Sequence, residues 1–201
     1  MPPKTATKTL EFLFDVGSPT TYLAHKRMPG LIARTGAEVI YVPVLLGGIF
    51  KATGNASPVM VPAKGVYMGT DMARFAKRFD VTLNMNPNFP INTLPMMRML
   101  AGLVGEDPFP GVVEVLFDAM WKGRKRMGDP AVVAEVLTKA GFDAGALMAL
   151  AETQEAKDAL KTNTETAIAR GAFGAPTFFV EDEMFFGQDR LDWVEEALAA
   201  S

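Results

Sequence analysis

The 201-residue sequence predicts an α/β fold in which a mixed sheet of four strands is interrupted by a large all-helical insert. Three observations lead to this prediction. The chain begins with a strand–helix–strand pattern over residues 10–45, which fits a right-handed parallel crossover. It ends with a strand–strand–helix pattern after residue 176. Between the two, the hydrophobic spacing is mostly helical. We therefore assign residues 9–46 and 172–201 to a sheet domain and residues 47–171 to the insert.

The first strand, the first helix and the second strand each carry a clear sequence signal. Residues 10–16 are rich in strand formers and almost continuously apolar, which suits a strand covered on both faces. Ser18 followed by Pro19 fits an N-cap and a first helical residue, and Gly36 ends the helix. Residues 39–45 are again rich in strand formers.

The insert is a series of helices separated by turn signals. Apolar residues at helical spacing predict helices over residues 71–79, 92–104 and 113–121, and a longer polar helix is predicted over residues 153–170. Asp129 with Pro130 opens a further helix that Gly141 closes, and Asp143 caps the next.

The last segment returns to the α/β pattern. Residues 177–181 predict a strand, and residues 184–186 predict a second strand that pairs antiparallel with it. A final helix opens at residues 187–190 and carries one apolar face.

Composition limits the classes of protein to which this chain can belong. Hydrophobic residues make up 49% of the chain and charged residues 21%, enough for a sizeable core. The formal net charge of −3 gives no general attraction to nucleic acid or to anionic membranes, and no apolar run reaches membrane-spanning length. The absence of cysteine excludes a disulfide framework and a cysteine nucleophile, and a single histidine argues against a zinc site.

Two short segments, far apart in the sequence, indicate the type of α/β fold. Residues 17–21 (Gly-Ser-Pro-Thr-Thr) join the first strand to the first helix, and residues 174–177 (Gly-Ala-Pro-Thr) lead into a later strand. This pair is typical of a thioredoxin-like fold, whose redox members carry Cys-x-x-Cys at the corner. Without cysteine, the side chains of this corner cannot exchange disulfides. A hydroxyl at a helix N-terminus is placed instead to hold the thiolate of another molecule.

Six motifs, in order along nearly the whole chain, carry a family resemblance. They are Phe14-Asp15-x-x-Ser18-Pro19-x-x-Tyr22-Leu23-Ala24, Gly54-Asn55, Pro62-x-Lys64-x-x-Tyr67-Met68, Asn92-Thr93, Gly171-x-Phe173-Gly174-x-Pro176-Thr177 and Phe186-Gly187-x-Asp189-Arg190-Leu191. With these motifs the chain resembles the 2-hydroxychromene-2-carboxylate isomerase family, which is related to the kappa-class glutathione transferases. The resemblance implies glutathione as cofactor or co-substrate.

The resemblance also implies roles for individual residues. Ser18 is expected to be catalytic, because a hydroxyl that donates to the glutathione thiolate lowers the pKa of that thiol. The residues implied to bind glutathione are Asn55, Lys64, Ala175, Pro176, Gln188 and Asp189. Those implied to contact the organic substrate are Tyr67, Met68, Asn92 and Thr93. Family members often carry an aromatic residue at the position of Thr20, so Thr20 makes that wall of the pocket smaller and more polar.

Several of these residues also have a structural interpretation that the sequence leaves open. Ser18 fits an N-cap, a role that is compatible with catalysis. Asp189 equally fits an N-cap of the last helix, and Lys64 fits an ordinary surface lysine. Pro176 fits either a strand-edge proline or the cis proline of a thioredoxin-like fold.

The resulting prediction is a glutathione-dependent isomerase of 2-hydroxychromene-2-carboxylate or a related aromatic or conjugated acid. A kappa-like glutathione transferase that conjugates electrophiles is the alternative, because both reactions begin with the same thiolate. A cysteine-less thioredoxin-fold chaperone or binding module is a more distant alternative. We expect a cytoplasmic homodimer that acts on a small-molecule carboxylic acid, holds no metal and has neither nucleic acid nor membrane as a partner.

Overall fold

Four strands, nine α-helices and two short 3-10 helices make up residues 8–200, the part of the chain that the computed structural model describes. The strands are β1 (Thr9–Phe14), β2 (Glu38–Pro43), β3 (Thr177–Val180) and β4 (Glu183–Phe186). The α-helices are α1 (Pro19–Thr35), α2 (Leu46–Thr53), α3 (Pro62–Phe79), α4 (Leu94–Leu103), α5 (Phe109–Trp121), α6 (Pro130–Lys139), α7 (Ala144–Leu150), α8 (Gln154–Ala169) and α9 (Leu191–Ala200). The 3-10 helices are η1 (Pro58–Met60) and η2 (Gln188–Arg190). None of the helices in this range combines the length and the apolar character needed to cross a bilayer.

The four strands form one mixed sheet in the order β2-β1-β3-β4. Strand β1 runs parallel to β2, with Leu10 opposite Val39, and antiparallel to β3, with Leu10 opposite Val180. Strands β3 and β4 pair antiparallel as a hairpin. The predicted four-stranded mixed sheet with an antiparallel last pair is therefore confirmed, although β2 ends at Pro43, two residues before the predicted end.

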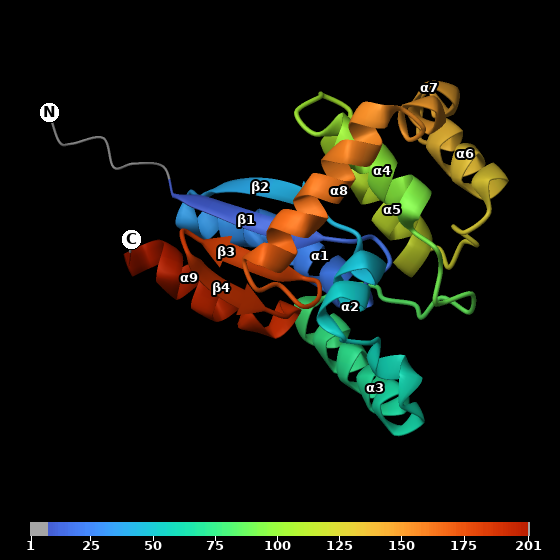
Figure 1. Cartoon of the computed structure of the whole chain (residues 1–201). Coiled ribbons are helices and arrows are strands. Elements are labelled where there is room, and N and C mark those ends of the chain that lie inside the picture. The colour runs from blue at the N-terminus through green and yellow to red at the C-terminus, as the bar shows by residue number, and fades with distance from the viewer. Residues whose placement is uncertain (1–7, 201) are drawn as a thin grey trace, which may run out of the picture.

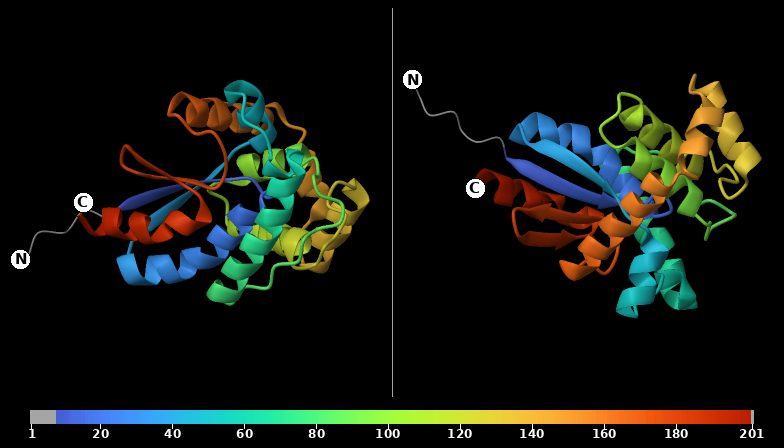
Figure 2. Two further views of the ribbon diagram at one scale, coloured as in Figure 1. Left: turned by 90° about the horizontal axis from the view of Figure 1, so that it is seen from below. Right: turned by 45° about the horizontal axis from the view of Figure 1, so that its top comes forward.

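Helices cover both faces of this sheet (Figure 1). In the left view of Figure 2, α8 lies over one face, while α1 and α9 lie under the other. Helices α4 to α7 gather beyond one end of the sheet, and α3 extends away from it on the side of α2 (Figure 1). Helices on both faces of a small mixed sheet are the arrangement expected of a thioredoxin-like fold.

Side-chain alternation along β1 supplies two separate cores. Phe12 and Phe14 belong to the larger core, together with apolar residues of α1 and α9. The ring of Phe12 stacks on that of Phe178 in β3, with ring centroids 5.2 Å apart. Leu13 points the other way, into a smaller core that it shares with Phe179 and residues of α2 and α8.

The larger core continues from the sheet into the helices of the insert. The ring of Phe14 lies 6.5 Å from that of Phe109 and 6.0 Å from that of Phe117, both in α5. At the end of α5, the fully buried Trp121 donates its indole N–H to the carbonyl of Val16 at 2.8 Å. The insert therefore holds the chain segment that follows β1.

Helix α8 belongs in sequence to the predicted insert, residues 47–171, but it packs on the sheet. It contacts β2 and α2, and Ala167 lies in the same core as Leu13. Just after the helix, Arg170 pairs with Glu11 of β1 at 2.7 Å. The predicted division of the chain at residues 46 and 172 is not tested by this packing and stays a prediction.

Two helical segments differ from the sequence prediction. Sequence spacing does not identify α2, and it identifies only the second half of α3, from residue 71. Within the described residues, neither helix has a side-chain cap at its start, where Leu45 and Val61 stand. Helix α2 also begins with Gly47 and Gly48, which are poor helix formers. The local signals that mark helix starts elsewhere are thus missing here.

We predict that Trp121→Phe lowers the free energy of unfolding by about 2–4 kcal/mol, since it removes a buried hydrogen bond and leaves a cavity. Urea unfolding followed by circular dichroism measures the change. Trp193→Phe is the matched control, because Trp193 is 55% exposed and its loss should change stability by no more than about 0.5 kcal/mol. Equal effects of the two substitutions would contradict the structural role of Trp121.

Candidate functional site

The hydroxyl of Ser18 closes the corner between β1 and α1, where this residue is only 4% exposed. As the N-cap of α1, Ser18 accepts the Thr21 N–H on its Oγ at 3.1 Å. Its hydroxyl donates to the carbonyl of Ala175 at 3.0 Å. The peptide bond that follows, between Ala175 and Pro176, is cis. The structure thus joins the two segments that indicated a thioredoxin-like fold, and both the N-cap and the cis proline are present.

Thr20 places a second hydroxyl beside that of Ser18. Its Oγ1 lies 3.0 Å from the Oγ of Ser18 and 3.5 Å from the carbonyl oxygen of Ala175. Two hydroxyls therefore converge on one carbonyl, which can accept a hydrogen bond from either. A phenyl ring at position 20 could not form these contacts. The departure from the family pattern thus changes the hydrogen bonding of the corner.

A buried carboxylate holds this corner against two other segments. Asp15 is 1% exposed and accepts hydrogen bonds from the N–H of Gly17 at 2.8 Å, the N–H of Leu46 at 2.9 Å and the hydroxyl of Thr93 at 3.1 Å. The donors come from the corner, the start of α2 and the segment just before α4. One side chain therefore fixes the relative positions of three parts of the chain.

Burial raises the pKa of Asp15 above its usual range, because desolvation disfavours the charged form. The three hydrogen bonds act in the opposite direction without offsetting the burial. The carboxyl is therefore less acidic than one in water, and the free energy of unfolding should depend on its ionisation.

The segment before α4 touches the corner directly. A Cβ atom at Gly17 would lie 2.7 Å from the Cγ2 of Thr93, so position 17 has no room for a side chain. Thr93 is buried, and its hydroxyl is engaged by Asp15. Asn92 is exposed beside it and accepts the N–H of Leu94 at 3.1 Å. Contact of Asn92 and Thr93 with a substrate stays a prediction.

Gln188 and Asn55 lie next to the segment that contains the cis proline. Gly187, at φ 105°, donates its N–H to the carbonyl of Pro176 at 3.0 Å and so holds η2 there. Gln188 is 6% exposed, yet its side-chain amide makes no hydrogen bond within residues 8–200. Asn55 donates to the carbonyl of Phe173 at 2.8 Å. Two residues predicted to bind glutathione are thus attached to the segment around Ala175, and the side-chain amide of Gln188 has no partner among the described residues.

The two predicted charged contacts lie at the surface. The carboxylate of Asp189 pairs with the guanidinium of Arg190, the next residue in the chain. Lys64 is exposed, and its side-chain ammonium makes no ion pair or hydrogen bond with any described residue. The structure does not join either side chain to Ser18, and their contacts with a ligand stay predictions.

Helix α3 is anchored along only part of its length. Its second half packs on α1, where Met72 and Ala76 share a core with Leu23, and Met68 lies against that core. In the first half, Tyr67 is 59% exposed. Tyr67 and Met68, predicted on the substrate side, thus occupy an exposed and a packed position on the same helix.

Asp15 and Trp121 support the corner, although neither residue was predicted from the sequence to have a role at the site. The available signal for Asp15 is an acidic residue near the end of the almost continuously apolar run 10–16, inside the first family motif. Trp121 gives no such signal, because a tryptophan at helical spacing is an ordinary core residue. Its partner, the carbonyl of Val16, becomes visible only in three dimensions.

Comparisons with known proteins agree with this geometry. The sequence profile of DSBA-like thioredoxin domains matches residues 9–199. The 2-hydroxychromene-2-carboxylate isomerase of Sphingobium xenophagum is 31% identical over 96% of this chain and 98% of that protein. Glutathione S-transferase kappa 1 of Caenorhabditis elegans is 28% identical over 94% of this chain and 90% of that protein. A solved structure of a 2-hydroxychromene-2-carboxylate isomerase has a TM-score of 0.82 at 30% identity and covers 96% of this chain and 95% of its own. The predicted fold and the family resemblance are confirmed.

We predict that Asp15→Asn changes how stability depends on pH. A raised folded-state pKa means that the contribution of Asp15 is fully present below its unfolded pKa, near about 4, and is lost as the pH rises through the folded value. The side-chain amide of asparagine does not titrate, so the variant lacks this contribution to the pH dependence of stability. The free energy of unfolding of Asp15→Asn, relative to the parent protein, should therefore rise as the pH increases from about 4 through the folded pKa of Asp15.

Urea unfolding across this pH range measures the difference. Asp143→Asn makes the same chemical change at an exposed N-cap and serves as the control. A difference between Asp15→Asn and the parent protein that stays constant with pH would contradict the raised pKa.

Proposed function

We propose that this chain, which belongs to the family of DSBA-like thioredoxin domains, is a glutathione-dependent enzyme that isomerises 2-hydroxychromene-2-carboxylate or a related aromatic or conjugated acid. The observation that carries the proposal is Ser18, whose hydroxyl lies at the amino end of α1 against the carbonyl of Ala175. Relatives that match almost the whole chain are isomerases and glutathione transferases, which supports glutathione chemistry of this kind.

The residues near the cis proline suit a small peptide with charged ends. A ligand can bind the amide of Gln188 without displacing a protein hydrogen bond. Asp189 and Lys64 offer one charge of each sign, for an ammonium group and a carboxylate. The pair between Asp189 and Arg190 is partly exposed and therefore weak, so this carboxylate can take a second partner. Glutathione, when bound, supplies a thiolate that adds reversibly to a conjugated carbon and so permits rotation about a former double bond.

The contribution of the protein is to keep the sulfur charged. Helix α1 runs for 17 residues from the corner and has no acidic side chain in its first turn, so its amino end favours a nearby anion. A hydrogen bond from Ser18 favours the thiolate further and lowers the pKa of the thiol. Asp15 and Trp121 act by holding the corner in place.

Thr20 can supply the hydrogen bond that the carbonyl of Ala175 loses when Ser18 donates to a ligand. The hydroxyl hydrogen of Ser18 already goes to the carbonyl of Ala175, and one hydroxyl cannot donate to two acceptors fully. If Ser18 turns to a ligand, this carbonyl loses its donor, which costs about 1–3 kcal/mol for a buried group. The hydroxyl of Thr20 is near enough to replace it. Thr20 thus lowers the free-energy cost of releasing Ser18.

A kappa-like glutathione transferase is the second candidate, favoured by the transferases among the relatives. It would use the same thiolate and release a stable conjugate. Turnover of a chromene carboxylate and of a generic conjugation electrophile, measured side by side, separates the two reactions. A chaperone or binding module would turn over neither compound. Cytoplasmic localisation, a homodimer and the absence of nucleic-acid and membrane partners stay predictions.

We predict that Ser18→Ala lowers turnover near neutral pH by about ten- to a hundredfold, because a charge-assisted hydrogen bond is worth about 1.5–3 kcal/mol. The pH–rate profile should shift to higher pH, while calorimetry should show a smaller change in glutathione binding. Unfolding should also reveal a loss of about 1 kcal/mol from the missing N-cap.

The control for Ser18→Ala is Asp129→Ala, which removes the N-cap of α6 far along the chain. It should cost similar stability and leave turnover unchanged. If Ser18→Ala behaves like Asp129→Ala, then Ser18 is only a cap and the proposed mechanism is wrong.

We predict that Thr20→Val lowers turnover by about two- to tenfold, the range expected for one neutral hydrogen bond. Thr20→Ser keeps the hydroxyl and should restore most of the parent rate. Measurement of kcat and of the glutathione dissociation constant for all three proteins tests this. Parent-like turnover in Thr20→Val would show that Ser18 needs no replacement donor.

A further inference from the structure

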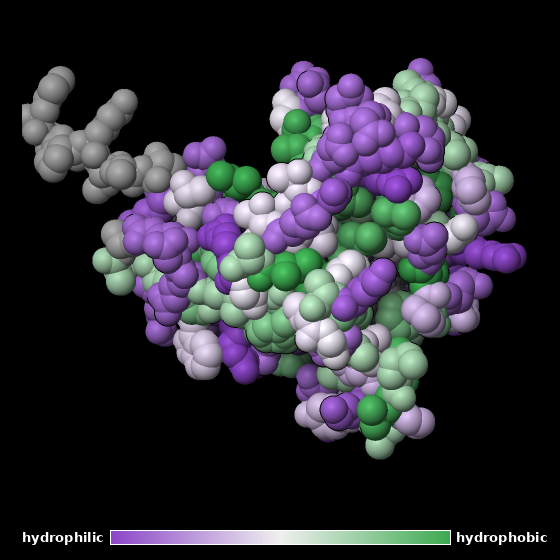
Figure 3. All heavy atoms as spheres, in the orientation of Figure 1, coloured by the Kyte–Doolittle hydropathy of each residue, from purple (hydrophilic) through white to green (hydrophobic). Residues whose placement is uncertain are grey.

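A hollow of about 640 Å³ lies between α2, α4 and α8, apart from the candidate site at Ser18. Neither Ser18 nor Ala175 lines it. Figure 3 shows the face on which it opens, with hydrophobic surface between the hydrophilic side chains over α8 and α4. Its volume is in the range of sites that hold small organic molecules.

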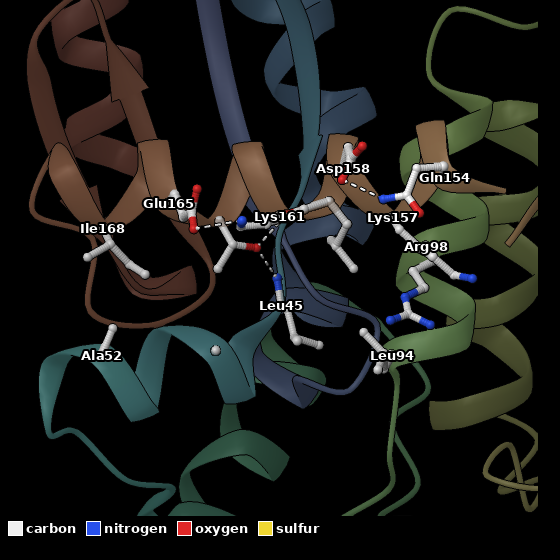
Figure 4. A pocket seen from close by; sticks show the side chains of 13 residues that line it. Leu45, Ala52, Leu94, Arg98, Gln154, Lys157, Asp158, Lys161, Glu165 and Ile168 are labelled. Carbon is white, nitrogen blue, oxygen red and sulfur yellow. Dashed lines mark hydrogen bonds and ion pairs between the residues drawn. The ribbon is translucent and has the colours of Figure 1, made fainter. Parts of the chain in front are cut away.

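The lining of the hollow combines apolar and polar side chains, and hydrogen bonds hold part of it in place. Leu45 and Leu94 lie close together on the side of α4, and Ile168 is an apolar side chain of the lining on α8 (Figure 4). Thr164, also in the lining, accepts the N–H of Leu45 at 2.9 Å and donates to the carbonyl of Leu160 at 2.7 Å. The wall formed by α8 is thus tied to the start of α2.

Five charged side chains line the hollow, and four of them have partners. The pairs are Lys161 with Glu165 at 3.9 Å, Lys157 with Glu152 at 3.0 Å, and Asp158 with Gln154 at 2.9 Å. Arg98 is different: it is half-buried, and within residues 8–200 its guanidinium makes no hydrogen bond and no ion pair, although its charge helps to lower the pKa of Glu152. In Figure 4 it projects from α4 above Leu94.

We propose that this hollow binds a small apolar monocarboxylate, with the carboxylate on the guanidinium of Arg98 and the apolar body against Leu45 and Leu94. A partly dehydrated guanidinium that makes no hydrogen bond to a described residue favours a planar anion that accepts two parallel hydrogen bonds. The charged side chains of the lining, three basic and two acidic, leave a net charge of +1, which suits a single negative charge. The apolar side chains beside Arg98 favour an organic body, which inorganic phosphate lacks.

The proposed ligand would lie next to the corner but apart from its chemistry. Two residues of the lining, Leu45 and Leu94, are the sequence neighbours of Leu46 and Thr93. Leu46 and Thr93 both donate hydrogen bonds to Asp15. Neither Ser18 nor Ala175 is among the residues that line the hollow, so binding there does not depend on the glutathione-dependent reaction.

Titration of the full chain with 2-naphthoate, followed by calorimetry and by methyl NMR, tests the proposal. We expect saturable binding with shifts at the methyl groups of Leu45, Leu94 and Ile168. Arg98→Gln should weaken binding at least about tenfold, as should replacing the probe with neutral 2-naphthamide. Lys161→Gln, which removes a lysine already paired with Glu165, should weaken it less than about threefold.

A second variant tests the location without touching the charge. Ala52 is an exposed residue of the lining, so Ala52→Phe should narrow the hollow, leave the fold intact and weaken 2-naphthoate binding about tenfold or more. Glutathione binding should not change in either variant. The proposal is overturned if 2-naphthoate shows no saturable binding at millimolar concentration, if Arg98→Gln binds like the parent, or if glutathione displaces the probe.

Discussion

The buried carboxylate of Asp15 links the parts of the chain that must stay together for the corner to keep its shape. Taking an ionisable group out of water is costly, and hydrogen bonds to it recover only part of that cost. Two of its donors, Leu46 and Thr93, lie 31 and 78 residues away in the sequence. The end of β1, the start of α2 and the approach to α4 therefore cannot shift independently. Ser18 begins its helix three residues later and takes its position from this arrangement.

The chemistry at the corner follows from replacing sulfur by oxygen within an unchanged fold. The hydroxyl of Ser18 stands where redox members of this fold carry the first thiol of Cys-x-x-Cys, and the hydroxyl of Thr20, two residues later, joins it at the carbonyl of Ala175. A hydroxyl of this kind cannot be oxidised to a disulfide, but it can donate a hydrogen bond to a sulfur atom that another molecule brings. Under the proposed function, the same backbone frame stabilises a thiolate in place of carrying out thiol exchange.

The sequence predicted those elements whose signals are local. Ser18, Asp129 and Asp143 cap their helices as predicted, because an N-cap depends on neighbouring residues alone. Helix α2 escaped prediction because its first N–H is held by Asp15, far away in the sequence. The candidate site likewise combines features with a sequence signal and features that depend on contacts in three dimensions. The resemblance placed Ser18 near Ala175, whereas the convergence of Thr20 on that carbonyl depends on distances that no spacing reveals.

The uneven anchoring of α3 has a consequence for how a ligand arrives. Its second half is tied to α1 through Met72, whereas its first half, with Lys64 and Tyr67, is exposed. Segments with few buried contacts open at a small fraction of the free energy of global unfolding, so the first half can adjust while the rest of the fold stays intact. Ser18 lies at the opposite extreme, in a corner held from several directions. Under the proposed function, the contacts of Lys64 and Tyr67 can therefore tolerate variation in the outer shape of a ligand, while the position of its reacting atom at Ser18 is strictly enforced.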